Sequence, residues 1–256
     1  MPCTGATLAA RAGEHCVSGF FVGRPGLLAY RDALILQEHL LAERSSVEYD
    51  SLLLLEHPAV ITLGRGADDR HLLRTETDLQ QAGIECLKSK RVGDITLHSP
   101  GQLVGYPIVD LNHFGRDLHG YLRRLEQILI ATLAAFGVAA TTRAGVTGVW
   151  IGQRKIASIG VAVRRWVSWH GFALNVSNDL SLFANIVPCG LKDVTMTSME
   201  QELGRSISMK CVEERLIEQY GERFQSPCLG ERTGETIAGG LGNWRQRGES
   251  DDVAQT

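Results

Sequence analysis

Residues 159–163, IGVAV, and residues 170–176, HGFALNV, decide the fold class of this chain. In both segments large apolar residues occupy every second position, and glycine, alanine or asparagine stands between most of them. A period of two is typical of a β-strand with one apolar face. We therefore expect two neighbouring, half-buried strands here, and the rest of the chain is interpreted outward from them.

Helices and further strands surround this pair in the sequence. Apolar residues recur every three or four positions over residues 26–44, over 117–136 and around 211–224, the spacing of helices with an apolar stripe. Short apolar runs predict further strands at 52–55, 59–63, 84–87 and 103–109. This mixture predicts a single α+β domain over residues 19–225.

The two ends of the chain differ from this domain. Residues 1–18 carry little pattern, and we expect a loose N-terminal segment. Residues 226–256 are rich in glycine and polar residues, a composition that predicts a disordered C-terminal tail.

Composition excludes several classes of protein. A net charge of −3 gives no sign of a nucleic-acid partner. No apolar run approaches the roughly 20 residues of a transmembrane helix, and no secretory signal is visible. The six cysteines form no C-x-x-C pair, which argues against a zinc site or a thioredoxin-like motif. We expect a cytoplasmic protein without a metal, a cofactor or a membrane partner.

Cys189 is the strongest candidate for chemistry. It lies between Pro188, which fixes its own φ, and Gly190, which permits φ angles closed to other residues. A thiol in such a turn has little side-chain bulk around it. This context favours a nucleophile over a structural cysteine, which more often lies inside an apolar element.

Three further segments combine small and polar residues. They are RVGDITLHSPGQ at 91–102, GQRKIASIG at 152–160 and HGFALN at 170–175. Taken singly, each has an ordinary interpretation: the first as a turn between strands, Lys155 as a solvated lysine and His170 as a core histidine. The first segment is not a phosphate loop, because it lacks the G-x-x-x-x-G-K-[ST] spacing.

Together with Cys189, these segments resemble the lipoyl(octanoyl) transferases, which move an octanoyl group from acyl carrier protein to a lysine of a lipoyl domain. The similarity extends from about Leu28 to Leu203 and includes LLEHP at 54–58 and YPIVDL at 106–111. It implies the fold of the catalytic domain of biotin and lipoate protein ligases, a mixed β-sheet flanked by helices.

The resemblance also assigns roles to residues. It implies that Cys189 is the catalytic nucleophile and that Lys155 lowers the pKa of its thiol. It implies octanoyl-acyl carrier protein as the donor. The lipoyl domains of 2-oxoacid dehydrogenases and the glycine cleavage H protein are implied as acceptors. The implied substrate-binding residues are Arg91, Val92, Gly93, Asp94, Ile95, Thr96, Leu97, His98, Ser158, Ile159, Gly160, Gly171, Phe172 and Ala173.

The expected reaction requires a thiolate, a slot for the acyl chain and hydrogen-bond donors for the oxyanion. An ammonium close to a thiol stabilises the thiolate, which attacks the donor thioester and carries the acyl group as a new thioester. The apolar acyl tail needs a slot, for which Ala157, Gly160, Gly171 and Ala173 are small enough. Backbone amides of the 91–98 segment or of the turn at Gly190 are candidates for holding the developing oxyanion.

The sequence departs from the family's usual pattern at three positions. Val92 stands where the family commonly has the first of two adjacent glycines, Leu97 where an aromatic residue is usual and Ser99 where glycine is usual. A β-branched residue resists positive φ, so Val92 either keeps an ordinary φ or marks a reshaped loop. Val92 is also a candidate for narrowing the acyl slot.

Three rival functions remain open from sequence. The first is an ATP-dependent lipoate- or biotin-type protein ligase, which activates its acid as an adenylate and needs no cysteine. The second is a cysteine hydrolase with His98 or His170 as the base. The third is a noncatalytic protein that binds acyl carrier protein.

Overall fold

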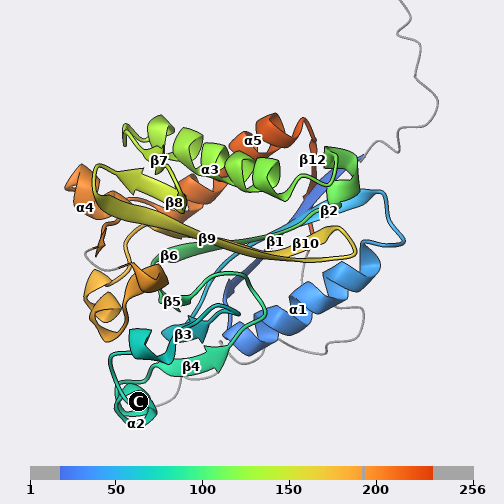
Figure 1. Cartoon of the computed structure of the whole chain (residues 1–256). Helices are drawn as coiled ribbons and strands as arrows, with labels where there is room; N and C mark the ends of the chain where they lie inside the picture. Colours follow the sequence, from blue (N-terminus) through green and yellow to red (C-terminus); the bar gives the residue numbers. More distant parts are fainter. Residues whose placement is uncertain (1–17, 192–193, 233–256) are drawn as a thin grey trace, which may run out of the picture.

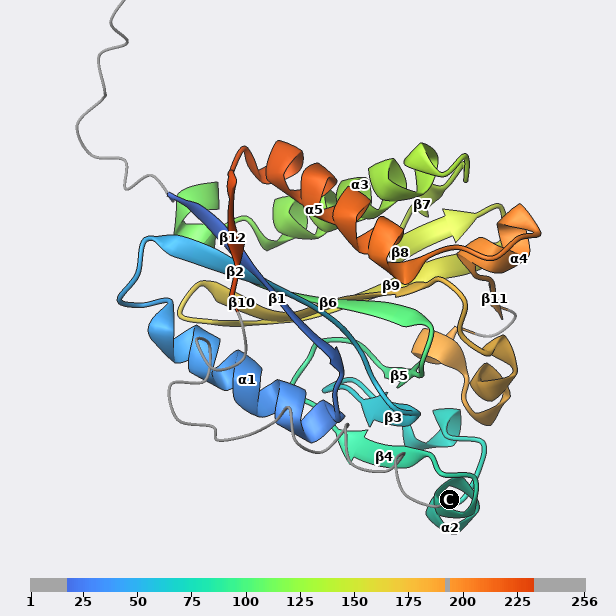
Figure 2. The same cartoon turned by 180° about the vertical axis from the view of Figure 1, so that it is seen from behind.

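The computed structural model describes residues 18–191 and 194–232. Over these residues the chain forms a large twisted sheet with helices on both faces and a smaller sheet beside one end of it (Figures 1 and 2). The strands of the large sheet are β1 (Gly19–Leu27), β2 (Tyr49–Glu56), β6 (Gln102–Ile108), β7 (Thr141–Arg143), β8 (Val146–Ile151), β9 (Arg154–Arg164), β10 (Val167–Asn175), β11 (Thr195–Met196) and β12 (Cys228–Glu231).

The large sheet is mixed. Among the described residues its strand order is β12-β1-β2-β6-β10-β9-β8-β7, with β11 paired to β9. β1 runs parallel to β2 and β12, whereas β6, β10, β9 and β8 pair antiparallel with one another. The two strands predicted at 159–163 and 170–176 are therefore neighbours near the centre of the sheet, as expected.

The smaller sheet has the order β4-β3-β5 within the described chain. Its strands are β3 (Val60–Leu63), β4 (Glu85–Lys88) and β5 (Ile95–His98), and the short helix α2 (Glu76–Gln81) precedes β4. Short 3-10 helices lie at η1 (Asp69–His71), η2 (Leu111–Phe114), η3 (Leu180–Asn185) and η4 (Pro188–Gly190). This sheet and η4 bring two distant segments, residues 91–98 and Cys189, to the same end of the molecule.

Helices cover the two faces of the large sheet separately. α3 (Leu118–Ala135) and α5 (Met209–Phe224) pack together on one face, while α1 (Tyr30–Glu43) covers the other, and α4 (Met199–Leu203) lies beside β11 (Figures 1 and 2). The buried stripe of α3 is Tyr121, Leu125, Ile128, Leu129 and Leu133, which recur at helical spacing. Asp117 begins α3 by accepting a hydrogen bond from the Gly120 N–H at 2.9 Å.

Two apolar cores follow from this arrangement. One lies under α3 and α5 and receives Ala157, Val161, Phe172 and Leu174 from the central strands. The other lies under α1 and receives Ala162, Trp169 and Ala173 from the same two strands. A third cluster fills the smaller sheet and includes Ile95 and Leu97.

Most elements predicted from the sequence are present, with shifted ends. The helix expected over 26–44 begins only at Tyr30, because β1 continues to Leu27. β10 is buried along its whole length, so the expectation of a half-buried strand is wrong there: both faces of the sheet carry helices. No helix in the described residues is long and apolar enough to cross a membrane.

The predicted C-terminal tail begins too early. Residues 228–231 form β12, which pairs parallel with β1, so the expectation of disorder is wrong for residues 226–232. A strand of sequence CLGE has no alternation of apolar and polar residues, which is why composition alone missed it. Residues 1–17 and 233–256, where a loose segment and a disordered tail were expected, lie outside the described residues.

The central strands approach one another so closely that two positions must be glycine. A Cβ at Gly105 of β6 would lie 2.1 Å from Cζ of Phe172, and one at Gly171 of β10 would lie 2.1 Å from the Gly105 carbonyl oxygen. No real Cβ tolerates such contacts with backbone or with a packed ring. The aromatic ring of Phe172 thus fills the volume that a side chain at residue 105 would need.

We predict that Gly105→Ala lowers the free energy of unfolding by about 3 kcal/mol, because Phe172 and the strand must shift to admit the methyl group. Urea denaturation followed by circular dichroism measures this. Gly66→Ala is the matched control, since its new Cβ would meet only the Gly93 carbonyl oxygen, at 3.5 Å. Equal stability of the two variants would contradict the close packing described here.

Candidate active site

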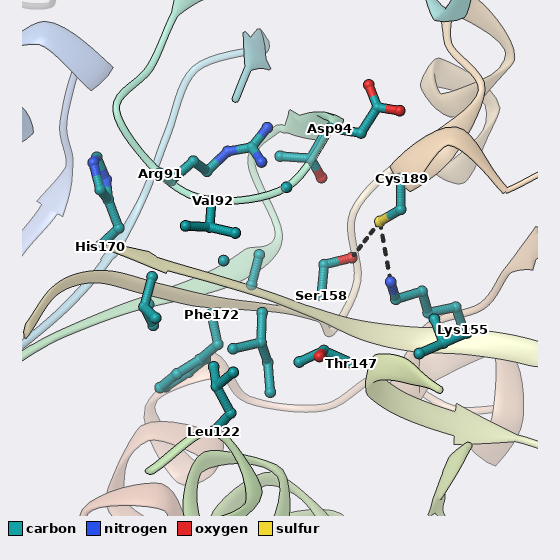
Figure 3. Close-up of a pocket in the computed structure, with 18 of the residues that line it drawn as sticks. Arg91, Val92, Asp94, Leu122, Thr147, Lys155, Ser158, His170, Phe172 and Cys189 are labelled. Atoms are coloured by element: carbon teal, nitrogen blue, oxygen red, sulfur yellow. Dashed lines mark hydrogen bonds between the residues drawn. The ribbon is translucent and has the colours of Figure 1, made fainter. Parts of the chain in front are cut away.

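A cavity of about 320 Å³ lies between β9, β10, the 91–94 loop and the η4 turn (Figure 3). Cys189 and Lys155 stand at one end of the drawn site, and His170 stands at the other. All but two of the predicted catalytic and substrate-binding residues line it: Cys189, Lys155, Arg91, Val92, Gly93, Asp94, Thr96, His98, Ser158, Ile159, Gly160, Gly171, Phe172 and Ala173. Segments separated by up to a hundred residues in sequence therefore form one site.

Cys189 sits in a strained turn. Its φ is 56° and its ψ is 20°, the left-handed region, and Gly190 after it has a φ of 66°. The turn is closed by hydrogen bonds from the Gly190 and Leu191 N–H groups to the carbonyls of Val187 and Pro188. The sequence predicted that Gly190 could adopt a φ closed to other residues. That the cysteine itself adopts a left-handed conformation was not predicted, and it sets the direction of the thiol.

Lys155 is buried beside this thiol. Its ammonium donates a hydrogen bond to Sγ of Cys189 at 3.0 Å, and its side chain is only 1 % exposed. The expectation of a solvated lysine is therefore wrong. Nζ also lies 5.3 Å from the centre of the Trp150 ring, the cross-strand neighbour of Lys155 in β8. A buried cation in contact with a thiol stabilises negative charge on the sulfur.

The cavity extends to both faces of the sheet. Ser158 and Ala173 face α1, and the Ser158 hydroxyl lies 4.0 Å from Sγ of Cys189. Ile159 and Phe172 point to the α3 side, where Leu122 of α3 joins the lining. β8 pairs with β9 only as far as Ala157, and further along the Val161 carbonyl accepts the Val92 N–H at 2.9 Å. Between these two contacts, along residues 158–160 of β9, the cavity passes from one face of the sheet to the other.

Arg91 supports the loop above β9. Its guanidinium donates to the carbonyl and the hydroxyl of Thr62 in β3, at 2.6–3.1 Å. Burial lowers the pKa of Arg91, while the negative or polarisable groups around it, including Tyr30 and Cys189, act in the opposite direction. Its charge therefore contributes to a positive field around the sulfur.

Asp94 places a carboxylate at the mouth of the cavity. One oxygen accepts hydrogen bonds from the Ile95 and Asp68 N–H groups, and the other lies 2.5 Å from Nδ1 of His71. A Cβ at Gly190 would lie 2.3 Å from Oδ2 of Asp94 and 2.7 Å from the His71 ring. The Asp94–His71 pair thus packs directly against the turn that holds Cys189. His71 had not been identified from the sequence.

Histidine and tyrosine rings pack together on the side of the site that faces α1. Nδ1 of His57 donates to the Leu28 carbonyl oxygen at 2.6 Å, and Nε2 accepts from the Tyr106 hydroxyl at 2.7 Å. Nδ1 of His98 lies 2.8 Å from the Gln102 amide oxygen. Burial lowers the pKa of His57 to about 4 and that of His98 to about 3. At neutral pH these imidazoles are uncharged.

The structure corrects several other expectations. Ile95 and Leu97 do not line the cavity: alternation along β5 turns them into the core of the smaller sheet. Ala157 likewise belongs to the core under α3. Val92 has an ordinary negative φ, and its side chain is 58 % exposed.

Some of the expected oxyanion donors are already engaged. The N–H groups of Val92, Ile95 and Gly190 each donate within the protein, to Val161 O, Asp94 Oδ1 and Val187 O. Other lining residues had no local signal in the sequence, since only the folded chain brings them here. They are Tyr30, Tyr106, Leu118, Leu122, Gly145, Val146, Thr147, Val161 and Leu191. His170, which the sequence singled out as a core histidine or the base of a hydrolase, also lines the cavity.

Fold and site together define a class of protein. Residues 29–221 match the model of the lipoyl protein ligase A/B catalytic domain, and the chain belongs to this family. Within it, the chain belongs with the octanoyltransferases. It is 50 % identical to the octanoyltransferase of Solibacter usitatus over 205 residues, 80 % of this chain and 92 % of the relative. It is 54 % identical to that of Gloeobacter violaceus over 169 residues, 65 % and 74 % of the two chains.

Solved structures show the same fold at low identity. Lipoate-protein ligase A bound with ATP superposes with a TM-score of 0.70 at 16 % identity, covering 87 % of this chain and 91 % of the ligase. A putative lipoate protein ligase from T. acidophilum with bound lipoic acid gives 0.67 at 16 %, covering 87 % and 92 %. The expected mixed sheet flanked by helices is therefore confirmed. No cluster of three or more metal-ligating side chains occurs in the described part of the chain.

The buried histidines predict a pH dependence of stability. The pKa values of His57, His98 and His170 in the folded chain lie near 4, 3 and 3, below the ordinary value of 6.5, chiefly because burial disfavours the charged rings. The unfolded chain therefore binds more protons between these values. The contribution of these neutral histidines to the free energy of unfolding is therefore fully present above pH 6.5. It falls as the pH drops towards 4, by about 1 kcal/mol per pH unit for each histidine.

Urea unfolding at pH 7, 5.5 and 4.5 tests this prediction. His98→Gln should remove about one histidine's share of the pH slope, whatever its effect on stability at pH 7. His119→Gln is the control, since His119 is exposed on α3. If His98→Gln keeps the full slope of the unmodified protein, the buried neutral ring is not the cause.

Proposed function

We propose that this chain transfers an octanoyl group from octanoyl-acyl carrier protein to a lysine of lipoyl domains, through an acyl-thioester on Cys189. The observation that carries the proposal is the 3.0 Å contact between Nζ of a buried Lys155 and Sγ of Cys189. The names of the octanoyltransferase relatives support the acyl group and the reaction class. Lipoyl domains of 2-oxoacid dehydrogenases and the glycine cleavage H protein are the proposed acceptors.

In the first half-reaction the Cys189 thiolate attacks the donor thioester carbonyl. The new bond joins Sγ to the acyl carbon, and the bond to the carrier's sulfur breaks. The Lys155 ammonium gives its proton to the departing thiolate, so the carrier leaves as a thiol and Lys155 becomes neutral. One side chain thereby stabilises the nucleophile before attack and protonates the leaving group after it.

In the second half-reaction an acceptor lysine displaces Cys189. Its amine attacks the acyl carbon, an amide forms, and Sγ leaves as a thiolate. The acceptor ammonium loses two protons in forming the amide: neutral Lys155 regains the proton given up earlier, and the other proton leaves to solvent. Asp94 lies at the mouth of the cavity beside the Cys189 turn, and its carboxylate is suited to attract the incoming ammonium.

The cavity accounts for the acyl group. Ala173 lines it with a methyl group, and Gly160 and Gly171 line it with backbone. A Cβ at Gly160 would lie 2.9 Å from the Val92 carbonyl oxygen, and one at Gly171 would lie 2.1 Å from that of Gly105. Burying the methylene groups of an eight-carbon chain stabilises the complex by about 5 kcal/mol. The likeness to lipoate ligases supports the shape of this slot but not their ATP chemistry, since an adenylate route makes no use of a cysteine paired with lysine.

We predict that Cys189→Ala abolishes a hydroxylamine-labile octanoyl adduct, while Lys155→Met slows its formation by at least about 100-fold. Intact-mass spectrometry after mixing with octanoyl-carrier protein, followed by peptide mapping, measures both. Cys211→Ala is the control, because Cys211 is a free, exposed thiol on α5. An adduct that persists in Cys189→Ala would assign the nucleophile elsewhere.

The same assay separates the rival functions. Modification of a lipoyl domain that requires ATP and free octanoate would favour the ligase alternative. Release of octanoate without acceptor, at a rate matching transfer, would favour a hydrolase. Binding of the carrier with no adduct and no transfer would leave a noncatalytic carrier-binding protein.

For the acceptor step, we predict that Asp94→Asn slows transfer to the lipoyl domain about tenfold while loading of Cys189 changes less than threefold. The reason is that the carboxylate attracts the acceptor's ammonium but makes no contact with an uncharged acyl donor. Single-turnover measurements of loading and discharge distinguish the two steps. Asp69→Asn, at an exposed aspartate of η1, controls for a general loss of surface charge. Equal slowing of both steps would reject this role.

A further inference from the structure

His170 breaks the alternation of β10. Its φ is 55°, whereas a strand residue between Trp169 and Gly171 would ordinarily be extended. Its backbone N–H donates to Oε1 of Gln37 in α1 at 2.8 Å. The side chain consequently lies on the same side of the sheet as Arg91, and Phe172 lies on the opposite side (Figure 3). The sequence suggested that the His170 side chain lies in the apolar core. The residue is buried, but its side chain points to the other face of the sheet.

The ring at this position is left without polar partners. His170 is 1 % exposed and stacks on Trp169 with 4.2 Å between ring centres. Neither ring nitrogen has a hydrogen-bond partner among the described residues. Burial lowers the pKa of His170 to about 3, so the ring is neutral, with one N–H donor and one acceptor nitrogen. A left-handed non-glycine residue with two unsatisfied buried atoms is a feature that calls for a function.

The register of the strands places His170 at the far end of the acyl slot. Ser158, within 4.0 Å of Sγ of Cys189, pairs with Ala173, and Gly160 pairs with Gly171. His170 comes next and also lines the cavity. The two extended steps from residue 173 to residue 171 correspond to about 7 Å, and the left-handed His170 lies beyond them. An extended eight-carbon chain attached at Cys189 covers this span, and its last carbons would meet the imidazole.

We infer that the site also accepts medium-length acyl chains that carry a hydroxyl group at the ω end, and that His170 is the residue that recognises this group. The inference rests on the proposed transfer reaction and leaves the chemistry at Cys189 unchanged. A terminal methyl group would leave both ring nitrogens unpaired. A hydroxyl group donates to one imidazole nitrogen or accepts from the other, which relieves the cost of burying them.

The surroundings favour a neutral group over a carboxylate. The neutral ring offers one donor only. Of the two cations that act on His170, Arg91 already donates to Thr62, whereas Lys90 is 74 % exposed and pairs with Glu38 at 3.5 Å. Tyr30 and Tyr106, which line the same end, have their hydroxyls engaged with Ser89 and His57. A carboxylate would therefore lose its hydration without finding enough donors.

The test compares three carrier-bound donors: octanoyl, 8-hydroxyoctanoyl and 3-hydroxyoctanoyl. The two hydroxy donors have the same composition, but only the first carries its hydroxyl to the far end of the slot. We expect the unmodified protein to load 8-hydroxyoctanoyl onto Cys189 with a kcat/KM at least equal to that for octanoyl and about tenfold above that for 3-hydroxyoctanoyl. Intact-mass spectrometry measures the loading rates.

His170→Phe keeps a flat ring but removes both nitrogens, and it should lower the ratio of 8-hydroxyoctanoyl to octanoyl loading about tenfold. Ile35→Ala, at an exposed residue of α1 outside the cavity lining, should leave that ratio unchanged. A ratio that is unchanged in His170→Phe, or an unmodified protein that disfavours 8-hydroxyoctanoyl as strongly as 3-hydroxyoctanoyl, overturns the inference. If His170→Phe does not fold, the comparison of the two hydroxy donors still decides it.

The outcomes separate this inference from the proposed function. Failure of octanoyl itself to load Cys189 would reject the transfer reaction. Normal octanoyl loading together with no preference for the ω-hydroxyl would reject the recognition by His170 alone.

Discussion

The burial of Lys155 is the constraint on which the rest of the site depends. An ammonium removed from water is stable only with a partner that carries or accepts charge, and the partner here is Sγ of Cys189 at 3.0 Å. The surrounding chain packs closely around the Lys155 side chain, since a Cβ at Gly148 would lie 2.7 Å from Cε of Lys155. The backbone at residues 154 and 155 is held by pairing of β9 with β8 and β11. The turn at Cys189 must then meet the lysine, which explains a left-handed cysteine.

Strand β9 links this pair to the binding cavity. Its start holds Lys155 between β8 and β11, whereas its middle pairs only with β10 until Val161 meets the Val92 N–H. The interruption lets one strand both hold the buried Lys155 amine and leave room for the cavity. The ATP-bound lipoate ligase shares the fold at 16 % identity. Because one fold hosts different chemistries, the activation route follows from Cys189 and Lys155 rather than from the sheet.

Sequence patterns predicted what depends on local spacing. The period of two located β9 and β10, and the period of three to four located α3. Small residues at 160, 171 and 173 suggested a slot, and the resemblance paired Cys189 with Lys155, which the fold brings into contact. The contact of His71 with Asp94 and the arrival of Leu122 from α3 join segments far apart in the chain, so no local pattern contains them. His170 escaped prediction because alternation assumes extended backbone, and its φ of 55° reverses the side chain.

Two residues with strained, left-handed backbone lie at the two ends of the cavity. Six non-glycine residues of the described chain have positive φ, and four of them lie in turns or at element ends: Arg116, Arg165, Trp166 and Gln225. The other two, Cys189 and His170, line opposite ends of the cavity (Figure 3). Each such conformation costs about 1–3 kcal/mol, a cost that packing elsewhere must offset. The two strained residues come from separate elements, the η4 turn and strand β10, so their separation across the cavity depends on how the turn packs beside β9 and β10.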